Sequence, residues 1–256
     1  MKIKFLGVGS AFTTADYYQS NMLLTARNGR RMLIDCGGDI RFSLSECGIR
    51  FKWFAKDIDA IYISHLHADH IGGLEGVAYN TFFDEISPGC TLFIPESLEQ
   101  DLWENCLKGG LQCVQDREMR LDDYFVCAPI AENGPFQWQG ISFSLVKMIH
   151  ISERCRNPYS FGLVIKDGPR SVFISTDARF QPDLLARISE NVDLMFHDCE
   201  TQRVHSGVHA HFNDLRTLSL GLKQKMWLYH YQPNPTQKPE QEGFKGFVVK
   251  GQEFDL

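Results

Sequence analysis

The chain has 256 residues, of which 43% are hydrophobic and 23% are charged, and its formal net charge is −6. This length and composition predict one soluble globular domain that spans residues 1–256. The acidic balance argues against a protein that coats duplex nucleic acid, and no apolar run approaches the roughly 20 residues that a membrane span needs. The first seven residues read as a strand and not as a secretory signal, so we expect a cytoplasmic protein whose eight cysteines are reduced.

Apolar, β-branched runs alternate with turn signals in the first half of the chain. Asn28-Gly29 lies between two such runs and is a strong hairpin signal. Gly7-Val8-Gly9 reads as a tight turn, because no third glycine completes a phosphate-binding loop. A helix that begins at Pro95 is expected to stop at Gly109-Gly110. We predict strands at 3–6, 21–25, 31–35, 60–63 and 91–94, helices at 39–47, 72–83 and 95–107, a turn at Ser87-Pro88-Gly89, and mixed structure at 111–133 with a strand-like segment at 124–126.

The second half of the chain shows the same alternation. Gly168-Pro169 joins two apolar runs as a hairpin, and Pro182 begins a short helix. No repeat, low-complexity tract or linker divides the sequence. We predict strands at 141–146, 161–165, 171–175, 192–196 and 226–229, and a helix at 182–188.

One stretch concentrates side chains that bind metals. The predicted strand at 60–63 runs directly into Ser64-His65-Leu66-His67-Ala68-Asp69-His70, and Gly72-Gly73 follows, where the backbone can pass close to a bound group. Three histidines and one aspartate within six residues are donors that suit zinc, manganese or iron. A histidine-rich surface loop is the alternative, but four such donors at the end of a buried strand favour a metal site.

The His-x-His-x-Asp-His pattern of this stretch resembles the signature of the metallo-β-lactamase superfamily. The resemblance implies an α/β fold in which two mixed sheets flanked by helices form an αββα sandwich, with one or two metal ions at the strand ends. It also implies three ligands downstream, namely a histidine, a bridging aspartate and a last histidine. His150, Asp177 and His230 occur in this order, each just after a predicted strand.

The same resemblance implies two divalent ions, for which zinc is the first expectation and manganese or iron the alternatives. The expected ligands are His65, His67 and His150 for one ion, Asp69, His70 and His230 for the other, and Asp177 between them. Ions about 3.5–4 Å apart share a hydroxide that attacks a phosphodiester, because metal binding lowers the pKa of water from about 15.7 towards about 7. The aspartate at the bridging position favours two ions. Thr176-Asp177 could instead be a helix cap, and His150 or His230, taken alone, could be an ordinary histidine.

A second polar cluster precedes the last expected ligand. It resembles two motifs of the tRNase Z-like branch, here His-Asp-Cys-Glu at 197–200 and a histidine motif at His209 with an acid, Asp214, five residues further on. The alkoxide that leaves a phosphodiester needs a proton, so a histidine beside the metals would act as a general acid. We expect His209 in this role with His211 as the second candidate, and Asp69 as a further catalytic residue. The alternative is a structural or substrate-contacting role for these histidines.

The substrate follows from a missing segment and from a closer resemblance. A loop and a hairpin fill the interval from His150 to Asp177, which leaves no room for the flexible arm that tRNA-processing members carry there. The segments 18–21, 207–215 and 243–247 resemble phage anti-Pycsar proteins and their bacterial relatives.

This closer resemblance implies a homodimeric two-metal phosphodiesterase that acts on a small anionic phosphodiester and binds neither duplex nucleic acid nor membrane. Its substrates would be 3′,5′-cyclic CMP and cyclic UMP, with cyclic AMP and cyclic GMP as further ones, and hydrolysis would counter cyclic-nucleotide antiviral signalling. Two alternatives stay open. One is a tRNase Z-like ribonuclease acting on RNA 3′ ends or short oligonucleotides, and the other is a lactonase or thioesterase.

Overall fold

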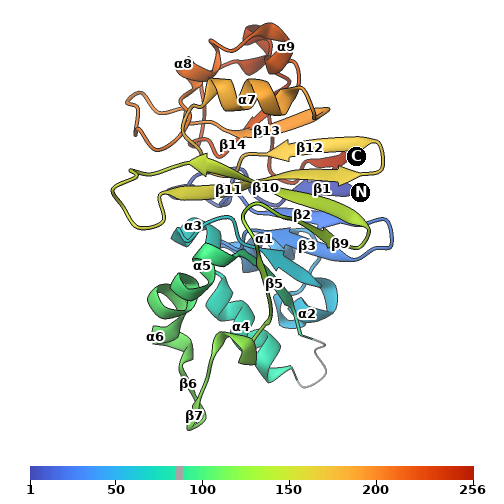
Figure 1. The fold of residues 1–256 in the computed structure, drawn as a ribbon, viewed down its shortest axis with the longest axis vertical. Coiled ribbons are helices and arrows are strands. Elements are labelled where there is room, and N and C mark those ends of the chain that lie inside the picture. Colours follow the sequence, from blue (N-terminus) through green and yellow to red (C-terminus); the bar gives the residue numbers. More distant parts are fainter. Residues whose placement is uncertain (85–88) are drawn as a thin grey trace.

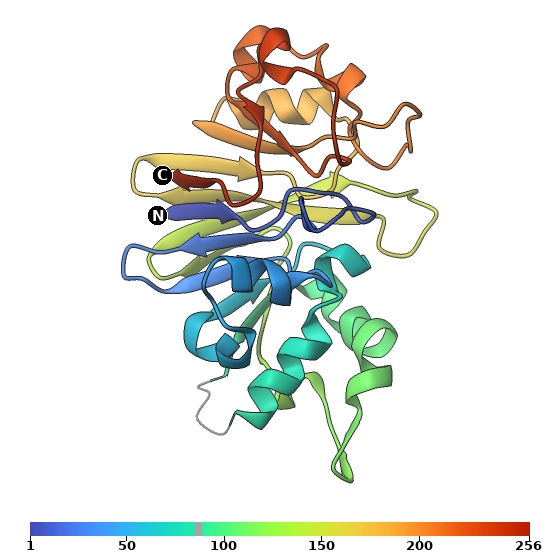
Figure 2. The ribbon, with the colours of Figure 1, turned by 180° about the vertical axis from the view of Figure 1, so that it is seen from behind.

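The computed structural model describes residues 1–84 and 89–256. These residues form two β-sheets that lie face to face, with helices on both outer faces (Figures 1 and 2). This is the αββα arrangement that the sequence predicts. Ser87 and Pro88 of the predicted turn lie outside the described residues.

The first sheet combines an antiparallel and a parallel part. Within the described residues its order is β16 (Glu253–Asp255), β1 (Lys2–Phe5), β2 (Met22–Thr25), β3 (Arg31–Ile34), β4 (Ala60–Tyr62), β5 (Thr91–Pro95) and β8 (Val126–Ile130). Strands β3, β4, β5 and β8 are parallel, and Ile34 pairs with Tyr62 in the register of β3 and β4. The residues that follow these two strands therefore emerge at the same edge of the sheet.

The second sheet has a similar plan. Its order among the described residues is β15 (Gly246–Phe247), β14 (Met226–Tyr229), β13 (Leu194–Asp198), β12 (Arg170–Ile174), β11 (Tyr159–Asp167), β10 (Ile141–Ile149) and β9 (Pro135–Trp138). Strands β12, β13 and β14 are parallel, with Ile174 beside Phe196 and Asp198 beside Tyr229. Their carboxyl ends therefore also meet at one edge.

Aromatic side chains fill the space between the sheets. Phe5, Tyr62, Phe143 and Tyr229 are all at most 1% exposed and belong to one apolar cluster with members from both sheets. The hydroxyl of Tyr62 donates a hydrogen bond of 2.7 Å to the carbonyl of Phe161, so the first sheet is also tied to the second by a buried polar contact. Burial of this apolar surface fixes how the two sheets face each other.

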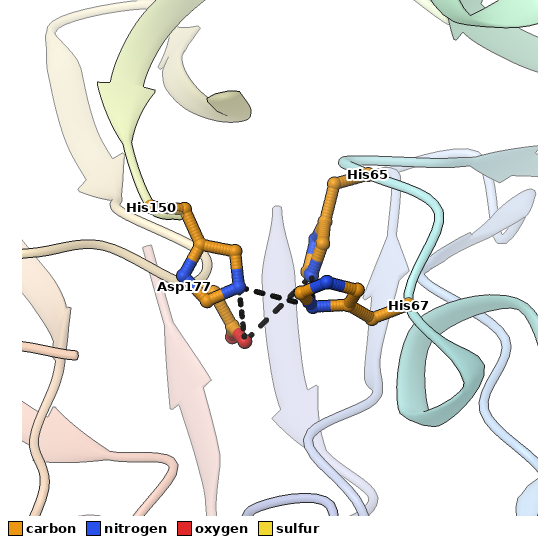
Figure 3. Close-up of side chains that lie close together, drawn as sticks. All are labelled: His65, His67, His150 and Asp177. Atoms are coloured by element: carbon orange, nitrogen blue, oxygen red, sulfur yellow. Dashed lines mark hydrogen bonds and ion pairs between the residues drawn. The ribbon is translucent and has the colours of Figure 1, made fainter. Parts of the chain in front are cut away.

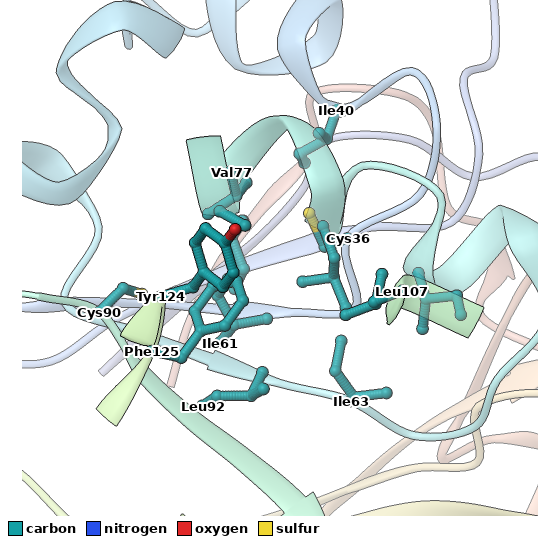
Figure 4. Close-up of a cluster of buried hydrophobic side chains, with 14 of the residues drawn as sticks. Cys36, Ile40, Ile61, Ile63, Val77, Cys90, Leu92, Leu107, Tyr124 and Phe125 are labelled. Atoms are coloured by element: carbon teal, nitrogen blue, oxygen red, sulfur yellow. The ribbon is translucent and has the colours of Figure 1, made fainter. Parts of the chain in front are cut away.

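Helices cover the two outer faces through separate apolar clusters. On the first sheet, Ile61, Ile63 and Leu92 meet helix side chains such as Val77 and Leu107 (Figure 4). The helices beside the first sheet are α1 (Ile40–Glu46), α2 (Phe54–Asp57), α3 (Ala68–Ile71), α4 (Leu74–Phe83), α5 (Glu96–Asp101) and α6 (Lys108–Leu111), and those beside the second are α7 (Pro182–Ser189), α8 (Phe212–Leu215) and α9 (Leu220–Lys223). Short 3₁₀ turns lie at Phe51–Trp53, Leu121–Asp123 and Pro239–Glu242, and a small hairpin joins β6 (Cys113–Val114) to β7 (Arg117–Glu118). Of the described helices, none is long and apolar enough to cross a bilayer.

Most predicted strands and helices are confirmed with ends shifted by a few residues, but the helix predicted to stop at Gly109-Gly110 is wrong in its extent. After α5 the chain continues through a π-helical segment, Leu102–Leu107, and then through α6, which contains both glycines. A Cβ on Gly110 would lie 2.4 Å from a carboxylate oxygen of Glu75 on α4. Gly109 and Gly110 thus lie within α6 and do not end the helix that precedes them.

The strand-like segment at 124–126 is also corrected. Strand β8 begins only at Val126, while Tyr124 and Phe125 are buried in the cluster beneath the helices. The hydroxyl of Tyr124 donates a hydrogen bond of 2.6 Å to the carbonyl of Leu111. The aromatic side chains at these two positions fill the core beneath the helices, and neither residue belongs to a strand.

Candidate metal centre

Strand ends from both sheets bring the predicted ligands to one edge of the sandwich. The connection after β4 carries four of them, and three others follow β10, β12 and β14. All are buried except the exposed His67; the set is His65, His67, Asp69, His70, His150, Asp177 and His230.

The first donor group consists of His65, His67, His150 and one oxygen of Asp177, whose side chains point towards a common centre (Figure 3). Nδ1 of His67 lies 3.1 Å from Nε2 of His65 and 3.0 Å from Nε2 of His150. Oδ2 of Asp177 lies 3.7 Å from Nε2 of His65 and 3.6 Å from Nε2 of His150.

The second donor group consists of Asp69, His70, His230 and the other oxygen of Asp177. Oδ1 of Asp177 lies 3.2 Å from Nε2 of His70 and 3.2 Å from Nε2 of His230. Oδ2 of Asp69 lies 3.4 Å from each of these two nitrogens. Asp177 thus presents one oxygen to each group.

These distances fit divalent ions. Four ligands placed tetrahedrally about 2.0–2.1 Å from zinc are roughly 3.3 Å from one another, close to the separations found in both groups. Nε2 of His70 and Oδ1 of Asp177 are buried without a hydrogen-bond partner among the described residues, although buried polar atoms are ordinarily satisfied. The two groups of histidine and aspartate side chains, buried except for His67, are therefore able to hold metal ions.

Outer contacts fix the orientation of the ligand rings. Nδ1 of His70 lies 2.7 Å from Oδ2 of Asp35, and Nδ1 of His150 lies 2.9 Å from the carbonyl oxygen of Val208. Asp35 also accepts hydrogen bonds of 2.8 Å from both the amide and the hydroxyl of Ser64, whose hydroxyl lies 3.0 Å from Nδ1 of His65. Such partners hold a histidine in the tautomer that presents Nε2 to a metal. The sequence reasoning missed Asp35 in this role, although its position directly after a strand parallel to β4 could have indicated it.

The backbone bends sharply where the strands deliver these residues. Asp35, Thr176 and His230, which each follow a strand, have positive φ angles of 63°, 54° and 63°. Residues other than glycine rarely adopt this conformation, and it concentrates at functional sites whose surroundings over-determine the backbone. The chain thus turns sharply at His230 itself, at Thr176 directly before Asp177, and at Asp35, which contacts His70.

Charge is distributed unequally over the site. Burial lowers the pKa of His65 well below its usual value and lowers that of His150 to about 4, so both rings are neutral at pH 7. Burial also opposes protonation of His230, but Asp177 beside it raises the pKa to about 10. Burial alone would raise the pKa of Asp177, yet His230 and His70 hold it well below its usual range. A divalent ion in the second group therefore competes with a proton on His230.

A histidine and an aspartate adjoin the two groups. Nδ1 of His209 lies 2.7 Å from Oδ2 of Asp198, while the other oxygen of Asp198 lies 3.5 Å from Nδ1 of His230. Burial acts against protonation of His209, but Asp198 outweighs it and raises the pKa above the usual value. Asp214, which the motif comparison set beside His209, instead lies 3.5 Å from Nδ1 of His205. Asp198 is a second residue that the sequence reasoning missed.

His211 lies outside these groups. Its Nε2 lies 2.8 Å from the carbonyl oxygen of Gln202, and its Nδ1 accepts a hydrogen bond of 3.1 Å from the amide of Asn213 as the cap of α8. Both ring nitrogens are therefore engaged by the backbone. This arrangement favours His209 over His211 as a proton donor.

Known proteins resemble this chain in sequence and in architecture. Residues 1–254 match the family model described as anti-Pycsar protein Apyc1. Proteins of that name from Paenibacillus harenae and from Bacillus phage vB_BveM-Goe7 are each 34% identical to the chain over its full length, covering 100% and 98% of their own lengths. The crystal structure of the metallo-beta-lactamase fold protein YhfI from Bacillus subtilis superposes with a TM-score of 0.73 at 17% identity, covering 99% of this chain and 98% of that one, which confirms the predicted fold. The chain therefore belongs to the anti-Pycsar protein Apyc1 family.

Proposed function

We propose that this protein is a metal-dependent phosphodiesterase that hydrolyses 3′,5′-cyclic nucleotides, including cyclic CMP and cyclic UMP, to nucleoside monophosphates. One observation carries the proposal. A chain that matches the Apyc1 family from end to end also holds two buried donor groups that share Asp177. In a phage or a bacterium, this activity would counter antiviral signalling by cyclic nucleotides.

The metal-binding roles follow the two donor groups. We propose that His65, His67 and His150 hold one ion, that Asp69, His70 and His230 hold the other, and that Asp177 joins them; zinc is the expected metal, with manganese or iron as alternatives. Bound at these positions, two divalent ions would supply a nucleophile at neutral pH and neutralise charge on the phosphoryl oxygens.

The proton for the leaving group comes from His209 in this proposal. Asp198 accepts the hydrogen bond of Nδ1 and stabilises the protonated ring, which leaves Nε2 to donate its proton to the ribose oxygen as the phosphorus–oxygen bond breaks. His211 would instead support the loop by capping α8.

Cleavage of pre-tRNA is disfavoured by the connections around the site. The segment between β10 and β11 is a short loop at 150–158, and β11 continues into β12 through a tight hairpin. In Figure 1 the loop at 150–158 projects from the edge of the sheet, and among the described residues it is the longest connection between His150 and Asp177 without a helix or strand. A compact rim of this kind suits a small diester.

A panel of cyclic nucleotides tests the proposal. Metal-analysed protein is incubated with 3′,5′-cyclic CMP, UMP, AMP and GMP, with labelled pre-tRNA, and with a lactone and a thioester. We expect conversion of cyclic nucleotides to monophosphates and loss of this activity in the Asp69→Ala variant, because Asp69 belongs to the second donor group. Turnover of pre-tRNA alone, or of lactones and thioesters alone, would contradict the proposal.

We further propose a homodimer that works in the cytoplasm. All eight cysteines are free, which suits a reducing compartment. Phe12, on the loop that follows β1, is 92% exposed, more than any other large apolar side chain among the described residues, and we place it at the contact between the two chains. Sedimentation of the purified protein is expected to give the mass of two chains, and Phe12→Ser to shift it towards one chain. A monomer at micromolar concentration would refute this assembly.

A further inference from the structure

A cavity of about 320 Å³ opens beside the first donor group, and its wall includes His65 and His67 themselves. The remaining residues that line the cavity form an apolar part and a polar part. Leu66, Cys106 and Ile151 give an apolar surface, while polar side chains come from the end of α5, from the π-helical segment that follows it and from the loop after β10. The cavity volume is at the lower end of the range for ligand pockets, and the wall is mostly apolar with a few convergent polar groups. Such a cavity suits a flat heterocycle that is attached to a phosphodiester at the metal centre.

We propose that this cavity receives the nucleobase of the substrate, and that Asn105 and Asn157 bind the hydrogen-bonding edge of the base while Asp101 positions both. The proposal rests on the proposed cyclic-nucleotide activity and assigns the residues that distinguish a nucleotide from any other phosphodiester.

A single buried carboxylate organises the polar wall. Asp101 is 6% exposed; its Oδ1 accepts a hydrogen bond of 2.7 Å from Nδ2 of Asn105, and its Oδ2 accepts one of 2.7 Å from Nδ2 of Asn157. Oδ2 also accepts a bond of 2.8 Å from Nε of Arg156, whose Nη2 pairs with Oδ1. Asp101 thus ties together side chains from a helix and from a loop 55 residues away.

This arrangement leaves hydrogen-bond acceptors for a ligand. Each asparagine donates one amide hydrogen to Asp101, and among the described residues neither amide oxygen receives a hydrogen bond from the protein. Each oxygen is therefore available to an amino or imino group, which every nucleobase carries on its pairing edge. The guanidinium of Arg156, 72% exposed at its side chain, keeps donors for a base carbonyl or a phosphate oxygen.

Two backbone features support a binding role for these positions. Asn105 and Cys106 lie in the π-helical segment Leu102–Leu107, a form that is rare in helices and frequent at functional sites. Asn157 has a φ angle of 53°, a left-handed conformation that asparagine tolerates better than most residues. Both features turn a side chain into the cavity wall at a local cost in backbone regularity.

The test compares a nucleotide with a diester that has no base. Asn105→Ala and Asn157→Gly, in which glycine keeps the left-handed backbone, are each expected to raise KM for cyclic CMP about three- to tenfold with kcat within about twofold. Hydrolysis of methyl p-nitrophenyl phosphate should stay unchanged in both variants. Asp101→Asn should raise KM for cyclic CMP by at least as much, because it removes the charge that orients both asparagines. Glu104→Ala and Arg154→Ala, exposed neighbours on the same helix and loop that do not line the cavity, serve as matched controls.

Inhibition by free cytidine separates this inference from the proposed function. Cytidine should compete with methyl p-nitrophenyl phosphate, more weakly in the two asparagine variants, whereas inhibition by inorganic phosphate should not change. Equal losses on both substrates, or an unchanged KM for cyclic CMP, would overturn the assignment. If the wild-type protein hydrolyses no cyclic nucleotide, the proposed function fails, and the cytidine measurement still decides whether the cavity binds a base.

Discussion

Asp177→Asn is expected to lower kcat/KM for cyclic nucleotides by about 10³-fold or more and to reduce the metal content from about two ions per chain to about one. Each oxygen of Asp177 faces a different donor group, at 3.6–3.7 Å from the histidine nitrogens of one and 3.2 Å from those of the other. An asparagine of the same shape keeps one oxygen and replaces the second by an amide nitrogen, which is no ligand. Loss of one ion removes several kcal/mol of transition-state stabilisation, and about 4 kcal/mol corresponds to the stated factor.

Metal analysis and circular dichroism complete this measurement. Asp193→Asn is the control. Asp193 is an exposed carboxylate that accepts hydrogen bonds from Ser171 at the end of β12 and β13 opposite Asp177. Its replacement should leave metal content and activity unchanged. An Asp177→Asn protein that keeps about two ions and normal turnover would show that the aspartate does not join the groups.

His209→Asn is expected to lower kcat for cyclic nucleotides by about 10²- to 10⁴-fold, the usual contribution of general acid catalysis. The loss should depend on the leaving group. A ribose alkoxide needs a proton as it departs, whereas p-nitrophenolate is stable without one, so hydrolysis of methyl p-nitrophenyl phosphate should fall less than about tenfold. Kinetics of the same variant on both substrates measure the difference.

His211→Asn provides the matched comparison. Its ring nitrogens contact only backbone groups, so its replacement should affect thermal stability more than turnover and should affect both substrates alike. If the loss depended on the leaving group in His211→Asn and not in His209→Asn, His211 would be the proton donor.

The convergence of the proposed ligands could be predicted from the sequence because it depends on strand ends. The strands that precede His65, His150, Asp177 and His230 are short apolar runs, and in a sandwich their ends converge at one edge. Local pattern therefore sufficed to place residues that are far apart in the chain. The prediction of a hairpin at Asn28-Gly29 is confirmed for the same reason, since its turn depends on neighbouring residues alone.

Residues whose role depends on packing between distant segments could not be predicted in this way. Asp198 serves His209 because the connection after β13 folds back onto the end of that strand, a course that no local pattern in the sequence indicates. The motif pointed instead to Asp214, which lies at the expected spacing but contacts His205. Gly109-Gly110 indicated a helix stop by local pattern, yet α6 continues through both glycines. Nothing in the sequence indicates that Asp101 organises a cavity wall, since two of its three partners, Arg156 and Asn157, lie 55 and 56 residues away.

The donor groups draw on both halves of the sandwich, and this has a consequence for the lifetime of the protein. His67 and His150 are 83 residues apart in the chain, and Asp69 and His230 are 161 residues apart. An ion held by either pair closes a long chain loop, and because it binds the folded state alone, it adds to the free energy of unfolding in proportion to the logarithm of the free metal concentration. Metal starvation of the cell would therefore act twice, since it would slow the reaction and also expose more of the protein to proteolysis.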